Sequence, residues 1–122
     1  MTEQEITNSN KLIAEFMEWE YEIHSHTYRL GESIRLNINF NNHWELLMPV
    51  VEKIENLTFG NTTQFDVVID RGGCCITQYF YGGEHQKWQT CLYNSLNKIE
   101  SVWACVVNFI KWYNTIKDES SN

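Results

Sequence analysis

The chain has 122 residues and a mass of 14.5 kDa, which is the size of one domain. Hydrophobic residues make up 43% and charged residues 20%, a composition that excludes wholesale disorder. The net charge of −7 argues against unaided binding to nucleic acid, including sequence-specific DNA binding, because that mode needs a basic surface. The acidic charge is concentrated at the start, where residues 1–22 hold six acidic residues and one basic residue.

The first helix is predicted to begin after the capping candidates Asn8, Ser9 and Asn10, which leaves residues 1–8 to fray. Its apolar positions recur at helical spacing, and its glutamates fall outside that stripe. The apolar positions are Leu12, Ile13, Phe16 and Met17, and the glutamates are Glu15, Glu18 and Glu22. We interpret these glutamates as a solvated helix exterior that could also meet a basic partner.

Two strands are predicted next, at residues 21–30 and 33–41, joined by a turn at Gly31 and Glu32. The second strand alternates strictly between apolar and polar residues. One of its faces therefore belongs in the core, and the other faces solvent or a partner. The expected core face carries Ile34, Leu36, Ile38 and Phe40, and the outer face carries Arg35, Asn37, Asn39 and Asn41.

A second helix is predicted from Trp44 to Ile54, opened by a capping box of Asn42 and Glu45. Pro49 lies within it and predicts either a kink or an irregular first turn. The expected buried stripe is Trp44, Leu47, Met48, Val51 and Ile54.

Three further strands are predicted at residues 65–70, 74–81 and 84–91, separated by turns at 70–73 and at Gly82–Gly83. In the middle strand the more polar alternate set belongs on the outer face. This set is Cys75, Thr77, Tyr79 and Tyr81.

The last helix is predicted to open with a capping box of Asn97 and Glu100 and to run to about Asn114, with residues 116–122 frayed. Its expected buried stripe is Ile99, Val102, Val106, Phe109, Ile110 and Tyr113.

The predicted order is therefore helix, two strands, helix, three strands, helix, which forms a single α+β domain over residues 1–122. Strands joined by short turns pair antiparallel, so we expect one antiparallel sheet of about five strands packed with three helices. The polar sides of the strands would then share one surface. That surface can bind a protein, stack single-stranded bases, be covered by a helix or remain solvated.

The compartment follows from the start of the chain, which is polar and acidic and lacks the apolar run of a signal peptide. The longest nearly uncharged apolar stretch, residues 102–110, is too short to span a membrane. We therefore expect a cytoplasmic protein. In that reducing compartment the four cysteines are expected to be free thiols, namely Cys74, Cys75, Cys91 and Cys105.

Patterns for catalysis or metal binding are weak. His24 and His26 would share one face of a strand, but the sequence has no Cys-x-x-Cys pair to complete a zinc site. No cysteine lies in an activating context, and both Gly-Gly pairs precede strands rather than the helix that a phosphate loop would open. We expect no enzymatic activity, metal or cofactor, and we keep a metal- or thiol-dependent enzyme as an alternative.

Three segments resemble small proteins encoded by phages and prophages of Bacteroidota. They are LIAEFMEW (12–19), WELLMPVVEKIE (44–55) and KIESVWACVVNFIKWYN (98–114), which together cover 37 of the 122 residues. The layout is also similar to phage α-β-α sandwich domains, which have helices on both sides of the sheet. The resemblance implies action inside an infected or lysogenic bacterium. It implies no chemistry, because the shared residues are helix stripes and caps.

Small acidic proteins of mobile elements often inhibit a host effector, as anti-CRISPR proteins do, so the resemblance favours a non-enzymatic inhibitor of antiphage defence. The expected partner is a host protein, either a CRISPR effector nuclease or its guide-RNA complex, whose basic channel an acidic surface could occupy. The alternative is a phage housekeeping or structural accessory protein, which an exposed apolar sheet patch and a dimer would favour. The expected contact residues are Glu15, Glu18, Glu22, His24, His26, Tyr28, Arg35, Asn37, Tyr79 and Tyr81.

Overall fold

The computed structural model describes residues 2–57, 63–70, 73–80, 86–93 and 97–120. Within these ranges the chain folds into three helices and two antiparallel sheets, each of three strands. The helices are α1 (Glu3–Phe16), α2 (Trp44–Glu55) and α3 (Lys98–Ser120). The strands are β1 (Glu20–Glu22), β2 (Thr27–Leu30), β3 (Ser33–Arg35), β4 (Thr63–Ile69), β5 (Gly73–Phe80) and β6 (Gln86–Tyr93). The α+β class is confirmed, and the prediction of a single sheet of about five strands is wrong.

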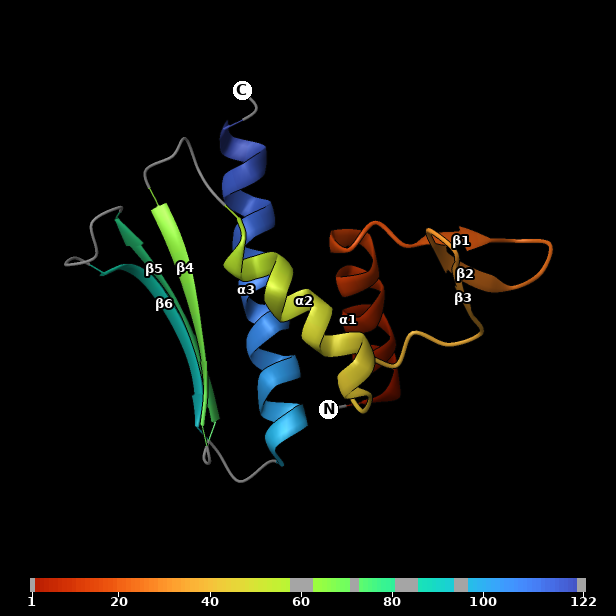
Figure 1. Cartoon of the computed structure of the whole chain (residues 1–122), viewed down its shortest axis with the longest axis horizontal. Helices are drawn as coiled ribbons and strands as arrows, with labels where there is room; N and C mark the ends of the chain where they lie inside the picture. Colours follow the sequence, from red (N-terminus) through yellow and green to blue (C-terminus); the bar gives the residue numbers. More distant parts are fainter. Residues whose placement is uncertain (1, 58–62, 71–72, 81–85, 94–96, 121–122) are drawn as a thin grey trace.

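The long helix α3 lies at the centre of the molecule (Figure 1). The β4–β6 sheet contacts one side of α3, α1 packs on another, and α2 crosses to contact both α3 and β4. The described helices lie on one side of this sheet, unlike the two-sided arrangement of an α-β-α sandwich (Figure 1). The β1–β3 sheet extends away from the body beyond α1 (Figure 1). We call β1–β3 with its turns, residues 20–36, the projecting sheet.

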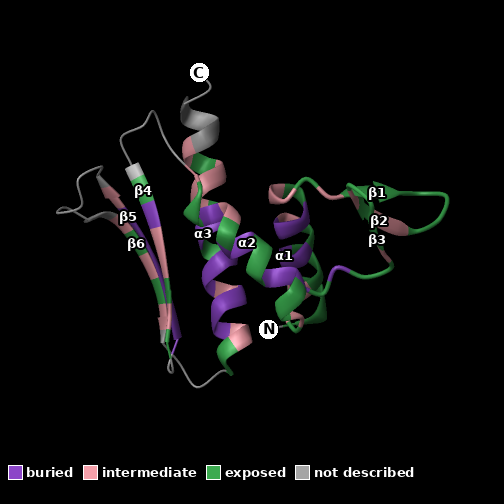
Figure 2. Ribbon diagram, in the orientation of Figure 1, coloured by how far each residue is buried: buried purple, intermediate pink, exposed green. Residues whose placement is uncertain are grey.

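The core is built around the stripe that the sequence predicts for α3. Val102, Val106, Phe109 and Ile110 are fully buried, and Figure 2 shows the buried residues gathered where α3 meets its neighbours. Phe65 of β4 packs edge-on against Phe109, with ring centroids 5.1 Å apart. The predicted cap of α3 at Asn97 is confirmed, because the Glu100 amide donates to Asn97 Oδ1 over 2.9 Å. The Glu100 carboxylate accepts a hydrogen bond from the Asn97 side-chain amide, instead of from the backbone N–H as in a capping box.

Helix α1 begins at Glu3 instead of after Asn10, so residues 3–8 are helical and were wrongly expected to fray. Thr2 is the cap, and its hydroxyl accepts a hydrogen bond from the Glu5 amide. Asn10 is buried inside the helix, where its side chain bonds Trp103 of α3 and Asn41. A tertiary partner therefore replaces the local capping role that the sequence suggested. At the other end of the chain, residues 116–120 continue α3.

The end of α1 also differs from the prediction, because the helix stops at Phe16. Glu18 adopts a φ of +66°, its amide bonds the Glu15 carbonyl, and the Trp19 amide bonds the Ala14 carbonyl. This pair of bonds is a Schellman motif with Glu18 in the left-handed position. Glu18 and Glu22 therefore lie beyond the helix, and only Glu15 belongs to its exterior.

The two predicted strands at 21–30 and 33–41 are three shorter strands in the structure. Residues 23–26 form a turn between β1 and β2, and the second strand ends at Arg35. Ile38 and Phe40 are buried as predicted, whereas Ile34 is 55% exposed and Leu36 is 72% exposed. The prediction of one continuous core face is wrong because the chain leaves the sheet after Arg35. Only the apolar residues beyond that point, Ile38 and Phe40, reach the core.

Helix α2 starts at Trp44 as predicted, but its cap lies one residue later than the predicted Asn42. Its N-cap is His43, which makes no side-chain capping bond within the described residues, so the Asn42 capping box is wrong. Pro49 lies inside the helix. The buried stripe is rotated from the prediction, because Trp44 and Met48 are each 37% exposed. The buried residues of α2 are Leu46, Leu47, Val50, Val51 and Ile54.

Cys75 of β5 and Cys91 of β6 are joined by a disulfide, which corrects the expectation of four free thiols. The strand register places the two residues directly opposite each other, with Cα atoms 4.1 Å apart. Cys74 and Cys105 are free and buried. Cys74 and Ile76 lie in the core cluster, so Cys75 and Thr77 are on the opposite face of the sheet. Both are nevertheless buried, at 7% and 3% exposure, so the prediction that they face outward to solvent or a partner does not hold for them.

Candidate protein-binding surface

The projecting sheet brings aromatic residues of two strands together. Its register places Tyr21 of β1 opposite Tyr28 of β2, and Tyr28 opposite Arg35 of β3. The turn before β3 has Gly31 at a φ of +60°, a conformation that glycine adopts without the penalty of a Cβ. The ring centroids of Tyr21 and Tyr28 are 5.0 Å apart and tilted by 53°.

His26 completes this group from the turn between β1 and β2. Its backbone is left-handed, with a φ of +55°, and its Nδ1 shares a hydrogen bond with the Tyr21 hydroxyl over 3.0 Å. His24 lies in the same exposed turn. The two histidines therefore lie in a turn and not on a strand, which removes the reason to expect both imidazoles on one face.

A cleft separates the projecting sheet from α1. One part of it, with a volume of about 390 Å³, is lined by Tyr21 and Tyr28 on one side and by the last turns of α1 on the other. A neighbouring part of about 310 Å³ shares Lys11, Tyr21 and Tyr28 and extends to His26 and Asn37. We call the first part the aromatic cleft, which is lined by Lys11, Ala14, Glu15, Trp19, Tyr21 and Tyr28.

Apolar side chains are exposed elsewhere on the projecting sheet. Ile23 is 71% exposed in the turn, and Ile34 and Leu36 lie on and just after β3. An open groove of about 570 Å³ runs along residues 33–39 to His43 and Leu46 at the start of α2. The exposed edge of β3 borders this groove, and such edges pair readily with other chains.

Four exposed carboxylates lie along the segment that leads from α1 into β1, and the last two of them, Glu20 and Glu22, line a surface pocket together with Ile34. They follow one another within eight residues, and we call them the acidic ridge, defined as Glu15, Glu18, Glu20 and Glu22. Basic side chains close by are Lys11 on α1 and Arg29 on β2. The ridge carries much of the N-terminal negative charge that the sequence shows.

The structure brings together some of the residues that the sequence proposed for partner contact and separates others. Glu15, His26, Tyr28 and Asn37 line the cleft between α1 and the projecting sheet. Arg35 lies opposite Tyr28 in the strand register, whereas Glu22 lines a separate pocket with Ile34. Glu18 lies between α1 and β1, and His24 lies in the turn after β1. Tyr79 belongs to β5 in the other sheet, and Tyr81 lies outside the described residues. The expected single polar surface across all strands is therefore wrong.

Sequence reasoning missed Lys11, Trp19 and Tyr21 as members of the site. Treating residues 21–30 as one strand concealed that Tyr21 and Tyr28 face each other across a turn. Strand propensity alone gave no signal for that turn, because residues 23–26 contain neither glycine nor proline.

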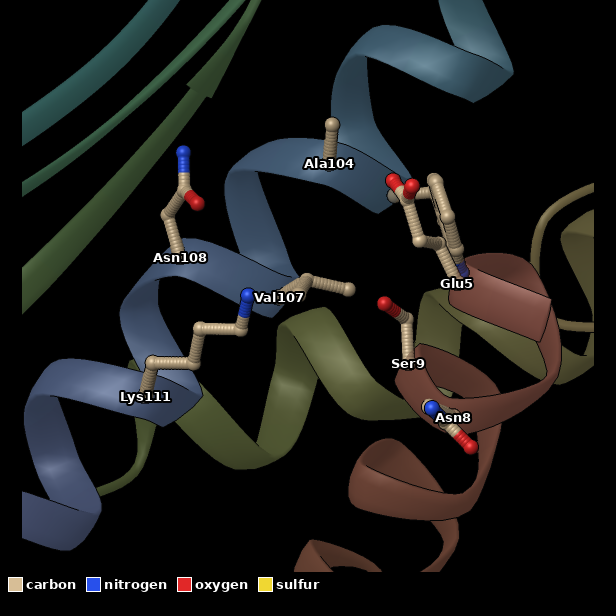
Figure 3. A pocket seen from close by; sticks show the side chains of 8 residues that line it. Glu5, Asn8, Ser9, Ala104, Val107, Asn108 and Lys111 are labelled. Carbon is tan, nitrogen blue, oxygen red and sulfur yellow. The ribbon is translucent and has the colours of Figure 1, made fainter. Parts of the chain in front are cut away.

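Another groove lies between α1 and α3, with a volume of about 280 Å³ (Figure 3). Glu5 and Ser9 border it from α1, and Val107 and Lys111 border it from α3 (Figure 3). Its Trp103 and Val107 walls are each 4% exposed and belong to the hydrophobic core. We interpret this groove as a feature of the packing between the two helices.

The free thiols of Cys74 and Cys105 are buried, and we interpret them as packing residues of the core. Cys105 Sγ lies within hydrogen-bond distance of two carbonyl oxygens, 3.4 Å from that of Cys74 and 3.5 Å from that of Thr90. The hydrogen bond between the Cys105 and Cys74 side chains, together with burial, raises the pKa of Cys105, and the same bond lowers the pKa of Cys74. In the described part of the chain, no group of three or more His, Cys, Asp or Glu side chains could hold a metal ion.

No family model, curated protein or solved structure matches the chain. The helices that the structure describes all fall short of the combined length and apolar character that crossing a membrane requires.

Proposed function

We propose that the protein has no catalytic activity of its own and inhibits a bacterial antiphage defence system by binding a host protein. The projecting sheet and the acidic ridge supply the contacts. The observation that carries this proposal is the coincidence of Ile23, Ile34 and Leu36, all more than half exposed, with Glu20 and Glu22 on a part of the fold that extends away from the core. Glu15 and Glu18 precede them, at and just beyond the end of α1.

Exposed apolar side chains gathered beside charged ones are typical of protein interaction sites. Burying Ile34 and Leu36 in a partner would remove apolar surface from water, which favours association. The acidic ridge would steer the protein toward a basic surface and raise the rate of association with it.

The channel that holds guide RNA and target strand in an RNA-guided nuclease is such a basic surface. An acidic protein seated there would compete with nucleic acid for the same site. The resemblance of three helical segments to phage and prophage proteins supports this choice of partner, and the net charge of −7 is consistent with it.

The same apolar residues also favour the alternative of a phage accessory protein that assembles with itself. In that case the edge of β3 would pair with a second copy. Light scattering coupled to size-exclusion chromatography separates the two proposals: inhibition of a host protein predicts a free monomer, and self-assembly predicts a dimer that is lost in the I34D/L36D variant.

Capture from a Bacteroidota host lysate tests the proposal with three baits. The wild type is compared with I34D/L36D and with the matched control V68D, because Val68 is 53% exposed on the other sheet. We expect wild type and V68D to retain the same nuclease of a defence system and to inhibit its cleavage, and I34D/L36D to do neither. Equal capture and inhibition by all three baits would exclude the projecting sheet as the binding site.

A further inference from the structure

The aromatic cleft has the composition of a site for an organic cation. Tyr21 and Tyr28 line it with rings tilted by 53° to each other, Trp19 lines it from just beyond the end of α1, and Glu15 supplies a carboxylate. Aromatic ring faces carry a negative electrostatic potential that attracts ammonium and guanidinium groups. A carboxylate beside them adds charge and hydrogen-bond acceptors.

The surroundings of the cleft strengthen this preference. Glu15 lies in the last turn of α1, where the helix dipole contributes partial negative charge. Glu18 follows in the exposed segment that leads to β1. The Schellman motif fixes Trp19 at the wall of the cleft, because its amide bonds the Ala14 carbonyl over 2.9 Å.

Lys11 is the opposing feature, because its positive charge lines the same cleft one helical turn before Glu15. An incoming cation must compete with the Lys11 ammonium for Glu15 and for the ring faces. The two charged residues therefore predict opposite effects: removing Glu15 weakens the binding of a cation, and removing Lys11 strengthens it. A site for an anion would show both effects reversed.

We propose that the aromatic cleft receives a cationic side chain, arginine in preference to lysine, from the partner protein. This inference rests on the proposed function. Arginine is favoured because its planar guanidinium can stack on an aromatic ring while it donates two hydrogen bonds to a carboxylate such as Glu15. The volume of about 390 Å³ accommodates one such side chain and leaves the projecting sheet free to make the apolar contacts.

The test is a titration of the full-length protein, labelled with ¹⁵N, with the peptide acetyl-Gly-Arg-Gly-amide. The matched control peptide has citrulline in place of arginine, which keeps the shape and removes the charge. The indole N–H signal of Trp19, assigned with the W19F variant, is the readout. We expect a saturable shift with the arginine peptide and none with the citrulline peptide.

Two variants distinguish the proposed site from non-specific charge attraction. We expect E15Q to weaken the arginine peptide about fivefold and K11M to strengthen it about twofold, and we expect E5Q, on the same helix but outside the cleft, to leave it unchanged. Equal shifts with both peptides, no saturable shift, or stronger binding by E15Q would overturn the proposal.

The outcome is separable from that of the proposed function. If the arginine peptide binds but no defence nuclease is captured, the cation site stands and the partner assignment fails. If a nuclease is captured through Ile34 and Leu36 while the arginine peptide does not bind, the cation site fails alone.

Discussion

The side chain of Asn10 connects three segments of the fold. It accepts a hydrogen bond from Trp103 Nε1 over 2.9 Å and donates one to Asn41 Oδ1 over 2.9 Å. Asn10 and Trp103 are 5% and 4% exposed, so water cannot readily replace either partner. The substitution Asn10→Ala therefore leaves a buried indole N–H without an acceptor.

The expected cost follows from these two bonds. An unsatisfied buried donor costs about 1–3 kcal/mol, and the bond to the half-buried Asn41 adds about 0.5–1 kcal/mol. The higher helix propensity of alanine offsets roughly 0.5 kcal/mol of this cost. We expect a net loss of about 2 kcal/mol in the free energy of unfolding, which lowers Tm by roughly 6–10 °C for a domain of this size.

Urea and thermal unfolding followed by circular dichroism measure this loss. The control is Asn8→Ala, the same substitution on the same helix at an exposed position whose side chain bonds only Gln4 in the described contacts. We expect Asn8→Ala to stay within about 0.5 kcal/mol of wild type. A double-mutant cycle with Trp103→Phe should show coupling of about 1 kcal/mol or more. Equal stabilities of the two alanine variants, or no coupling to Trp103, would refute this role of Asn10.

Three other predictions concern the C-terminal end of α1 and the disulfide. Lys53→Met should lower stability by about 1–2 kcal/mol in urea unfolding, because Lys53 Nζ donates to the Phe16 carbonyl and lies 4.7 Å from the centre of the Phe16 ring; Lys111→Met, an exposed control, should change little. Glu18→Gly should raise the free energy of unfolding by up to about 1 kcal/mol, and with it Tm, because glycine adopts the φ of +66° without strain. A loss of stability would contradict the Schellman assignment. Reduction of the Cys75–Cys91 disulfide, which spans 16 residues, should cost about 3 kcal/mol by the loop-entropy model. The C75S/C91S variant should reproduce that loss and become insensitive to reductant, whereas an unchanged Tm in reductant would show that the bond adds no stability.

The sequence predicted α3 well because all of its signals agree. Its apolar residues follow the helical period along the buried side, and Asn97 and Glu100 form a cap that depends only on neighbouring residues. The caps predicted for α1 and α2 are wrong, whereas the stripe and the cap of α3 can be read from that segment alone. The order and class of most elements were predictable for the same reason.

The two sheets were not predictable by that route. Alternation along residues 33–41 is the same whether or not another element covers the apolar face, so it could not show that Ile34 and Leu36 are exposed. The disulfide depends on the register that sets Cys75 opposite Cys91, which is a tertiary property. The aromatic cleft depends on a turn at 23–26 that places Tyr28 against Tyr21.

Phage infection of a defended host tests the central claim most directly. The wild type, V68D and I34D/L36D are each expressed in a Bacteroidota strain with an active RNA-guided nuclease system, and the plating efficiency of a targeted phage is measured. We predict that wild type and V68D restore plating and that I34D/L36D, expressed to the same level and folded by circular dichroism, does not. Failure of the wild type to restore plating, or equal restoration by I34D/L36D, would contradict the proposal.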